Sequence, residues 1–424
     1  MEADEFVVVE MKDAAMDVPA EQDHLDSLSS YIDGIADTLW PINKKIHDNP
    51  ELGYQEKIAH AALTGFLETR KGWKVTRSAY GLETAFVAVY DSGKKGPVVS
   101  FNAEMEADAL PGIGHACGHN LIAMASLSGA LATAECMEAY HIPGKVVLFG
   151  TPAEEGGGGK IKLLNAGAYK DYKCDINLIS HPGIVNDGAL IRTAAYTRFK
   201  VEYFGLEAHA AASPWLGINA LDALITAYNG LSVLRQQTMP GDIIQGHITD
   251  GGLAPNIIHA YAAGVFIARA NTRDRLAVLK KKVDACFEAG AAATGATLKS
   301  TFEQSYDDHV PNRALGRSYR HFFNRLGGAI PTADIDEIEH RTMASTDQGN
   351  ISYAMPSLSP GFWIRPGNIG SGPHSPEFTE VSGTREAFDL ALKVGKGLAA
   401  TAIDVLTRKG LLDEVKKEFE AMKR

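Results

Sequence analysis

Apolar residues recur at two different spacings along the first half of the chain. From Leu25 to Ile42 they return every three or four positions, which predicts a helix that ends near Asn49-Pro50. A second helix, rich in small residues, is expected over 121–134. Short uninterrupted apolar runs instead indicate buried strands, at 97–101, 145–150 and 176–179. Alternating helices and buried strands are typical of an α/β domain.

The spacing changes near Arg192. Phe199, Val201 and Tyr203 alternate with other residues, as in a strand with one buried face. The pattern then predicts a helix, two strands and another helix, over 218–234, 243–248, 257–267 and 273–289. These elements indicate an inserted α+β unit, which we place at 193–307.

Composition is that of an ordinary globular protein. A chain of 424 residues exceeds what one core usually supports, so two domains are expected. The net charge of −11, without a basic run, argues against a nucleic-acid partner. The acidic N-terminus lacks the features of a signal peptide, and no apolar segment is long enough to span a membrane. The four cysteines form no close-spaced framework, which favours a reducing, cytoplasmic location.

Several residues of metal-ligand type occur at loop-like positions. They are Cys117, His119, Glu155, His181 and His374. Five donors are too many for one open tetrahedral site, but they fit two ions that share a bridging group, with water as the nucleophile. The thiolate and imidazoles suit zinc, and the carboxylate widens the choice towards manganese.

Two of these donors follow predicted strands. Glu154 and Glu155 come after the strand at 145–150, and His181 comes after the strand at 176–179. In open α/β sheets, ligands bind at the carboxyl ends of the strands. Glu154 is expected to point away from Glu155, because neighbouring residues of an extended segment face opposite ways. The glycines before Lys160 do not make a phosphate loop, since Ile161 stands where that motif needs Ser or Thr.

The position of His374 decides the domain division. The chain must return to the first domain after about Asp307 for His374 to join the other ligands. The first domain therefore takes 23–192 and 308–424 around the insert at 193–307, and it closes with a helix over 385–406. Residues 1–22 are acidic and are expected to be loosely ordered.

Eight motifs in order carry a family resemblance, which runs from about Leu39 to the C-terminal helix. The chain resembles the aminoacylase and carboxypeptidase family of two-metal peptidases. Within it, the chain is similar to the branch of the indole-acetyl-amino-acid hydrolases, p-aminobenzoyl-glutamate hydrolase and dipeptidase-like members. The motifs lie at 47–54, 109–120, 151–159, 181–182, 208–215, 250–256, 345–350 and 373–378.

The resemblance implies a fold and a set of roles. The fold is an α/β, mixed-sheet metallopeptidase catalytic domain with helices on both faces, plus an inserted α+β dimerisation or lid domain. The five donors stand at metal-ligand positions, and Glu154 stands at the general base. His209 stands where the family polarises the scissile carbonyl, often across a homodimer, although it could instead only begin a helix. Asn256 and Arg269 resemble residues that meet the carboxylate of the substrate.

One segment departs from the family pattern. The chain reads Ala-Glu-Met-Glu-Ala-Asp-Ala-Leu-Pro over 103–111, two residues more than usual, so we expect a bulge at the end of the preceding strand. The expected activity is metal-dependent hydrolysis of a small N-acyl amino acid or dipeptide with a free carboxylate. Two alternatives are amide-bond formation at the same site and a catalytically retired metal-binding scaffold. The intact Glu154 argues against the scaffold.

Overall fold

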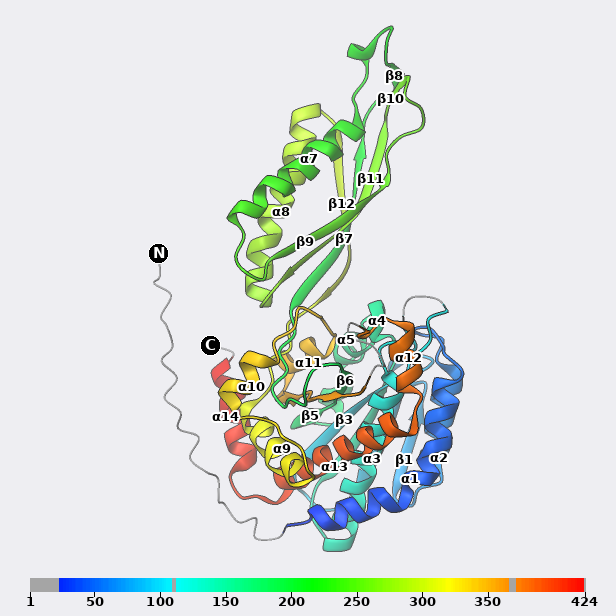
Figure 1. Ribbon diagram of the computed structural model, residues 1–424, viewed down its shortest axis with the longest axis vertical. Helices are drawn as coiled ribbons and strands as arrows, with labels where there is room; N and C mark the ends of the chain where they lie inside the picture. Colours follow the sequence, from blue (N-terminus) through cyan, green and yellow to red (C-terminus); the bar gives the residue numbers. More distant parts are fainter. Residues whose placement is uncertain (1–22, 109–111, 366–370, 423–424) are drawn as a thin grey trace. The chain divides into compact units, whose positions relative to one another are not determined.

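The computed structural model describes residues 23–108, 112–365 and 371–422, and the chain forms two compact units (Figure 1). The first unit comprises the described residues within Met1–Arg192, Val310–Arg341 and Ile351–Arg424. The second comprises Thr193–His309 and Thr342–Asn350. The division inferred from the sequence kept 342–350 with the first domain. The expectation for residues 1–22 lies outside the described residues.

A six-stranded mixed sheet forms the centre of the first unit, in the order β1-β2-β4-β3-β5-β13. The last four strands of this order are parallel to one another, whereas β2 runs antiparallel to both β1 and β4. A separate parallel pair joins β6 to β14. The bounds are Trp73–Arg77 (β1), Phe86–Asp91 (β2), Val98–Glu104 (β3), Lys145–Thr151 (β4), Ile176–Leu178 (β5), His181–Gly183 (β6), Ser357–Leu358 (β13) and Gly361–Trp363 (β14).

Helices cover both faces of this sheet. The side chains of a strand alternate between the two faces, and here both sets are apolar and need to be buried. On β4, Val146 and Leu148 belong to one buried cluster, and Val147 and Phe149 belong to another. The first cluster includes α1 (Leu25–His47), α2 (Lys57–Glu68), α3 (His119–Tyr140), α9 (Arg313–Arg325), α13 (Arg385–Thr407) and α14 (Leu411–Met422). The second includes α5 (Gly159–Asn165), α6 (Ala168–Asp171) and α11 (Gln348–Ala354). The remaining helices are α4 (Glu154–Gly157), α10 (Ala333–Glu339) and α12 (Pro376–Ser382).

Small residues allow α3 to lie deep inside the first unit. Almost all of its residues from His119 to Met137 are buried, and α13 packs directly on it. A methyl group added at Gly129 would come within 3.2 Å of the Gly395 carbonyl oxygen. This close packing fixes the first turn of α3 beneath the carboxyl ends of the strands. Within the described part of the chain, no helix combines the length and apolar character needed to cross a membrane.

The second unit is an antiparallel sheet with two helices packed on it. Its strands follow the order β12-β7-β11-β9, and the three phenylalanines Phe199, Phe266 and Phe287 join the sheet to the helices. A two-stranded ribbon pairs β8 with β10. The bounds are Ala195–Phe204 (β7), Ala208–His209 (β8), Ala220–Leu234 (α7), Ile243–Asp250 (β9), Ile257–Ile258 (β10), Tyr261–Ala270 (β11), Arg273–Thr294 (α8) and Thr297–Tyr306 (β12).

The strand expected over 257–267 is wrong as a single element. It breaks between Ile258 and Tyr261, because β10 pairs with β8 whereas β11 pairs with β7 and β9. The carbonyl of His259 at the break accepts a hydrogen bond from Ala220, at the start of α7. One largely apolar segment therefore contributes strands to two different sheets.

Candidate metal centre

The candidate site of the first unit lies where β3, β4 and β5 end and α3 begins. Cys117 precedes α3, and His119 is its first residue. Gly118 between them has a φ of 74°, and a side chain there would place its Cβ 2.7 Å from the Pro182 ring. Glycine at 118 therefore lets the loop approach the segment that carries His181.

All five sequence-predicted donors converge on Cys117. The Cys117 Sγ lies 3.3 Å from the Nε2 of His181. Cys117, His119 and His181 have donor atoms within 4.8 Å of one another, and so do Cys117, Glu155 and His374. The shared thiol gives the arrangement expected of two ions with one bridging ligand.

The three histidines are oriented to present Nε2 to a metal. The Nδ1 of His119 lies 3.0 Å from the Glu106 carbonyl oxygen, and that of His181 lies 2.7 Å from the Pro182 carbonyl oxygen. The Nδ1 of His374 contacts the Asp108 carboxylate. We assign the Nδ1 protons from these acceptors, which leaves each Nε2 as the basic atom.

The charge state of the site also fits a divalent cation. Burial, together with the carboxylates of Glu155 and Glu154, raises the pKa of the Cys117 thiol well above its usual value, so its thiolate requires a bound cation. Burial lowers the pKa of His181 to about 4, which keeps its ring neutral. Among the described residues, the buried Nε2 of His119 has no hydrogen-bond partner. Such orphaned atoms are rare, and a metal ion would satisfy this one.

The conformation of Glu154 and Glu155 differs from the extended segment that the sequence suggested. Both residues lie in the short, irregular element α4, after Ala153 with a φ of 56°, and Glu155 has a non-helical ψ of 74°. Their carboxylates nevertheless diverge. Glu155 groups with Cys117 and His374, whereas Glu154 groups with Glu106 and His119. The candidate ligand Glu155 and the candidate base Glu154 therefore point apart because of the left-handed turn at Ala153, and not because they alternate along a strand.

The expected bulge at residues 104–108 is also wrong. The pairing of β3 with β4 continues without a register shift to Glu104 and Thr151, and the additional residues follow the strand. The Glu106 carboxylate accepts hydrogen bonds from the backbone amides of Glu154 and Glu155. Burial raises its pKa to about 7. The additional residues thus bring a buried carboxyl group beneath α4.

Sequence reasoning missed the buried charged residues Glu104, Glu106 and Lys160 near the candidate donors. The Lys160 Nζ lies 2.6 Å from the Glu104 carboxylate, and both side chains are almost fully buried. The repeated Glu in the departing segment was the available signal. Only the fold brings Lys160, 56 positions further along the chain, next to it.

The other candidate residues belong to the second unit. His209 lies on β8, and its Nδ1 accepts hydrogen bonds from the amides of Ala211 and Ala212 at 3.2 and 3.1 Å. The neutral ring therefore carries its proton on Nε2 and is a hydrogen-bond donor there. The Asn256 carbonyl accepts from the Ala210 amide at 3.0 Å, so Asn256 lies beside His209.

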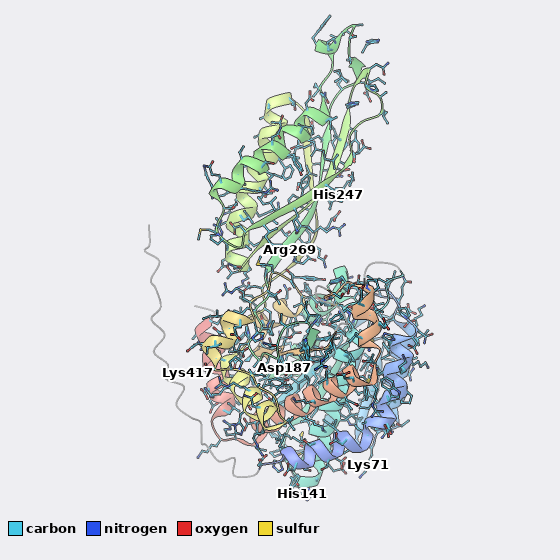
Figure 2. The ribbon with its side chains drawn as sticks, viewed as in Figure 1. Lys71, His141, Asp187, His247, Arg269 and Lys417 are labelled. Carbon is cyan, nitrogen blue, oxygen red and sulfur yellow. The ribbon has the colours of Figure 1, made fainter. Side chains whose placement is uncertain are left out.

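Arg269 lies near the opposite end of β11 from the β8–β10 ribbon. Figure 2 labels Arg269 at this end of the sheet. Its guanidinium donates to the Met343 carbonyl and the Ser345 hydroxyl at 3.2 and 2.9 Å, and it lies over the Tyr196 ring. At about 3.3 Å per residue, the strand from Tyr261 to Arg269 spans about 26 Å. The second unit therefore brings His209 and Asn256 together and keeps Arg269 apart from them.

Comparison with known proteins agrees with this architecture. Residues 98–394 match the model of peptidase family M20/M25/M40. The chain belongs to this family. The Xaa-Arg dipeptidase of Mus musculus is 39% identical over 400 residues, covering 92% of this chain and 90% of that protein. A p-aminobenzoyl-glutamate hydrolase chain of Escherichia coli (strain K12) is 28% identical over 461 residues, covering 91% of each.

A solved structure shares the fold of this chain. A putative aminohydrolase from methicillin-resistant Staphylococcus aureus superposes with a TM-score of 0.71 at 18% identity, covering 91% of this chain and all of that chain. The resemblance and the α/β fold with an inserted α+β unit are confirmed. This M20 chain is a metal-dependent amide hydrolase, and the alternatives of a retired scaffold or of amide synthesis are not favoured.

Proposed function

We propose that this M20 enzyme hydrolyses dipeptides or N-acyl amino acids at two divalent ions held by Cys117, His119, Glu155, His181 and His374. The convergence of all five donors on the Cys117 thiol carries the proposal. Glu154 supplies the general base, and His209 supplies a hydrogen-bond donor to the substrate carbonyl. Asn256 and Arg269 bind the substrate carboxylate.

The chemistry divides between the ions and the side chains. Bound divalent ions would supply Lewis-acid activation of the amide carbonyl and of water. The Glu154 carboxylate takes a proton from the attacking water and returns it to the leaving nitrogen. The Nε2–H of His209 donates to the carbonyl oxygen as negative charge develops there, and its two backbone partners hold the required tautomer.

The first substrates to test are dipeptides with a C-terminal arginine. The Mus musculus and Homo sapiens relatives, 39% and 38% identical, are named Xaa-Arg dipeptidases. For the metal, thiol and imidazole donors favour zinc, and the Glu155 carboxylate also admits manganese.

A matched substrate series tests this proposal. Protein stripped of metal and reconstituted with zinc or with manganese would be assayed on Ala-Arg, Ala-Lys, Ala-Leu and N-acetyl-arginine. We expect hydrolysis only after reconstitution, with the highest kcat/KM on Ala-Arg. Full activity in the stripped protein would contradict metal dependence, and equal kcat/KM on Ala-Leu would contradict the preference for arginine.

We also infer that the enzyme is a homodimer joined through the second unit. Its two edge strands differ in charge. The β12 edge carries Lys299 and Glu303, whereas β9 has no lysine, arginine or acidic residue before Asp250. Charged side chains protect an edge strand from pairing with another chain, so β9 is the edge suited to a second copy.

Two further features of the second unit support the dimer. The β8–β10 end exposes apolar side chains, since Trp215 is 77% exposed and Leu253 is 90% exposed. A patch of large exposed apolar side chains is typical of an interaction surface. The length of β11 adds a second reason, because Arg269 can share a substrate with His209 and Asn256 only if they come from different protomers.

A pair of edge variants tests the dimer. Ile248→Lys places a charge on β9, and Phe302→Lys places the same charge on β12 as the matched control. We expect the β9 variant to become monomeric in light scattering after size exclusion, while the control stays dimeric. A wild-type monomer, or dissociation by the β12 variant alone, would contradict the proposed interface.

The enzyme is further inferred to be cytoplasmic. All four cysteines are free in the described chain, as in a reducing compartment. Cell fractionation tests this, and recovery with secreted proteins would contradict it.

A further inference from the structure

Two buried atoms beside Cys117 face each other without hydrogen bonds. The Nε2 of His119 and the Oε2 of Glu104 are 3.5 Å apart, and among the described residues neither finds a hydrogen-bond partner. His119 is fully buried, and Glu104 is 2% exposed. A buried polar atom that has lost water without gaining a partner destabilises the fold, so two such atoms side by side call for an explanation.

A hydrogen bond between the two side chains does not explain the pair. An N–H···O hydrogen bond spans about 2.7–3.2 Å, so 3.5 Å is too long. Two donors that each lie about 2.1 Å from one tetrahedral ion are about 3.4 Å apart. The observed separation therefore suits two ligands of a shared ion.

The other oxygen of Glu104 is already occupied. Its Oε1 lies 2.6 Å from the Nζ of Lys160, whose side chain is fully buried at the second position of α5. A buried lysine needs a paired carboxylate. Lys160 thus holds the carboxylate so that Oε2 is directed at His119.

We propose that Glu104 is a sixth protein donor of the metal centre, binding the ion held by His119, and that Lys160 is the positioning residue that orients it. The proposal rests on the two-ion function proposed above. A second carboxylate raises the share of hard oxygen ligands in the centre, and such ligands favour manganese over zinc. The lysine that follows the glycine run therefore serves the metal centre and not a phosphate.

The decisive experiment removes the whole ion pair. Glu104→Gln/Lys160→Met eliminates both buried charges, a change that is often tolerated when neither partner is left alone. Lys160→Met keeps the carboxylate. The control is Asp404→Asn/Arg408→Met, which removes another acid–base pair of the first unit, in which Asp404 is buried and Arg408 half-buried. Manganese stoichiometry by elemental analysis and affinity by competition with a chromophoric chelator are the readouts, with circular dichroism to report folding.

We expect wild type and the control to bind two ions at equal affinity. Lys160→Met should still bind two ions, with the affinity for one of them lowered roughly 10- to 100-fold, because Glu104 loses the partner that orients it. The first double variant should lose one ion, with its affinity reduced more than about 100-fold, beyond the roughly 10- to 100-fold that loss of an outer partner costs. Two ions bound at wild-type affinity in that variant would overturn the proposal. Equal loss in Lys160→Met would overturn the assignment of the donor to Glu104.

A second measurement does not depend on the variants folding. In a crystal of the wild-type enzyme soaked with manganese, anomalous scattering would locate the ions. Glu104 Oε2 within about 2.2 Å of one ion supports the proposal, and a separation above about 3 Å overturns it. Failure of the wild type to bind any metal would instead refute the proposed function itself.

Discussion

At the scale of single residues, two unusual backbone conformations occur at the candidate metal centre. Ala153 and His374 have φ values of 56° and 66°, in a region that residues other than glycine rarely adopt. One precedes the candidate base, and the other is a candidate ligand. Such conformations cost about 1–3 kcal/mol each and concentrate at functional sites. Local backbone strain therefore occurs at two positions that orient candidate catalytic or metal-binding side chains.

Glu154→Gln tests the general base at this scale. The amide is nearly the same size but cannot take a proton from water, so we expect kcat to fall by roughly two to four orders of magnitude. Metal content should stay at the wild-type value, because Glu154 is not among the proposed ligands. Steady-state kinetics and elemental analysis on the same preparation measure both. Unchanged kcat would remove Glu154 from the mechanism.

Glu106→Ala tests the support beneath α4. The substitution removes the acceptor for the amides of Glu154 and Glu155. We expect the free energy of unfolding, measured in urea, to fall by about 3 kcal/mol. Glu106→Gln, which keeps a carbonyl acceptor, is the control and should lose less. Equal stability of the alanine variant and the wild type would show that these hydrogen bonds contribute little.

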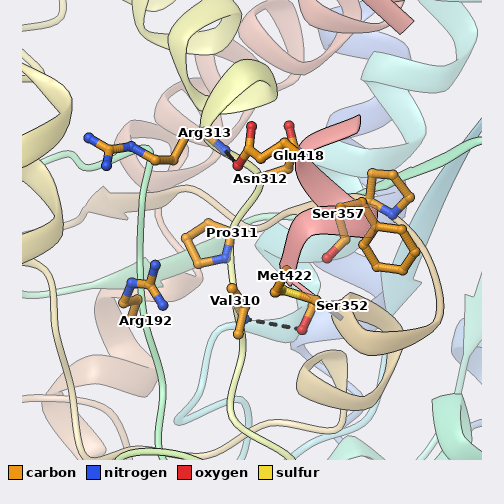
Figure 3. A pocket seen from close by; sticks show the side chains of 11 residues that line it. Arg192, Val310, Pro311, Asn312, Arg313, Ser352, Ser357, Glu418 and Met422 are labelled. Carbon is orange, nitrogen blue, oxygen red and sulfur yellow. Dashed lines mark hydrogen bonds between the residues drawn. The ribbon is translucent and has the colours of Figure 1, made fainter. Parts of the chain in front are cut away.

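At the scale of elements, helix ends are tied by side chains from distant segments. The first turn of α9 has Asn312 as its cap, and Glu418 of α14 accepts hydrogen bonds from the amides of Arg313 and Ala314 at 2.6 and 3.0 Å (Figure 3). Four amides at the start of any helix lack helical partners. The C-terminal helix therefore supplies an acceptor for two of these amides.

Glu418→Ala separates this contact from the packing of α14. We expect a loss of about 1–2 kcal/mol in the free energy of unfolding, as for the removal of a helix cap. Lys417→Ala, at an exposed neighbouring position of α14, is the control and should stay within about 0.5 kcal/mol of wild type. Thermal unfolding monitored by circular dichroism gives both values. Equal losses in the two variants would contradict a specific role for the Glu418 carboxylate.

At the scale of the whole molecule, mixed dimers test whether His209 acts across protomers. His209→Ala and Glu154→Gln chains are each expected to be inactive. If His209 serves the partner, one site of each mixed dimer regains both groups, and random exchange should restore about a quarter of wild-type activity. A tagged-chain pulldown must first establish exchange. Exchange without recovered activity would show that His209 does not act across the interface.

Metal removal should also lower the stability of the folded chain. A ligand that binds only the native state adds about 2.7 kcal/mol at a free concentration of 100 times its Kd. Chelation should therefore lower the midpoint of thermal unfolding, and added manganese or zinc should restore it. Magnesium at the same concentration is the control for ionic strength. An unchanged midpoint would contradict tight binding to the native protein.

The sequence alone determined the elements and the kinds of donor. Uninterrupted apolar runs located β4 and β5, because strands buried on both faces need no polar alternation. Apolar residues repeated every three or four positions located α1 and α13, because such a repeat gives a helix one apolar face. The sequence also identified Cys117 and Glu155 as candidate ligands, because only a few residue types can bind a metal ion.

Only the tertiary structure decided the geometry around those donors. The turn at Ala153, the break between β10 and β11, and the burial of Glu106 depend on partners far away in the chain. Lys160 and Glu104 show this most clearly, because neither residue predicts the other and each buried charge is stabilised by its partner. Local spacing reveals which face of an element is apolar, whereas the pairing of buried charges is set when separate elements pack.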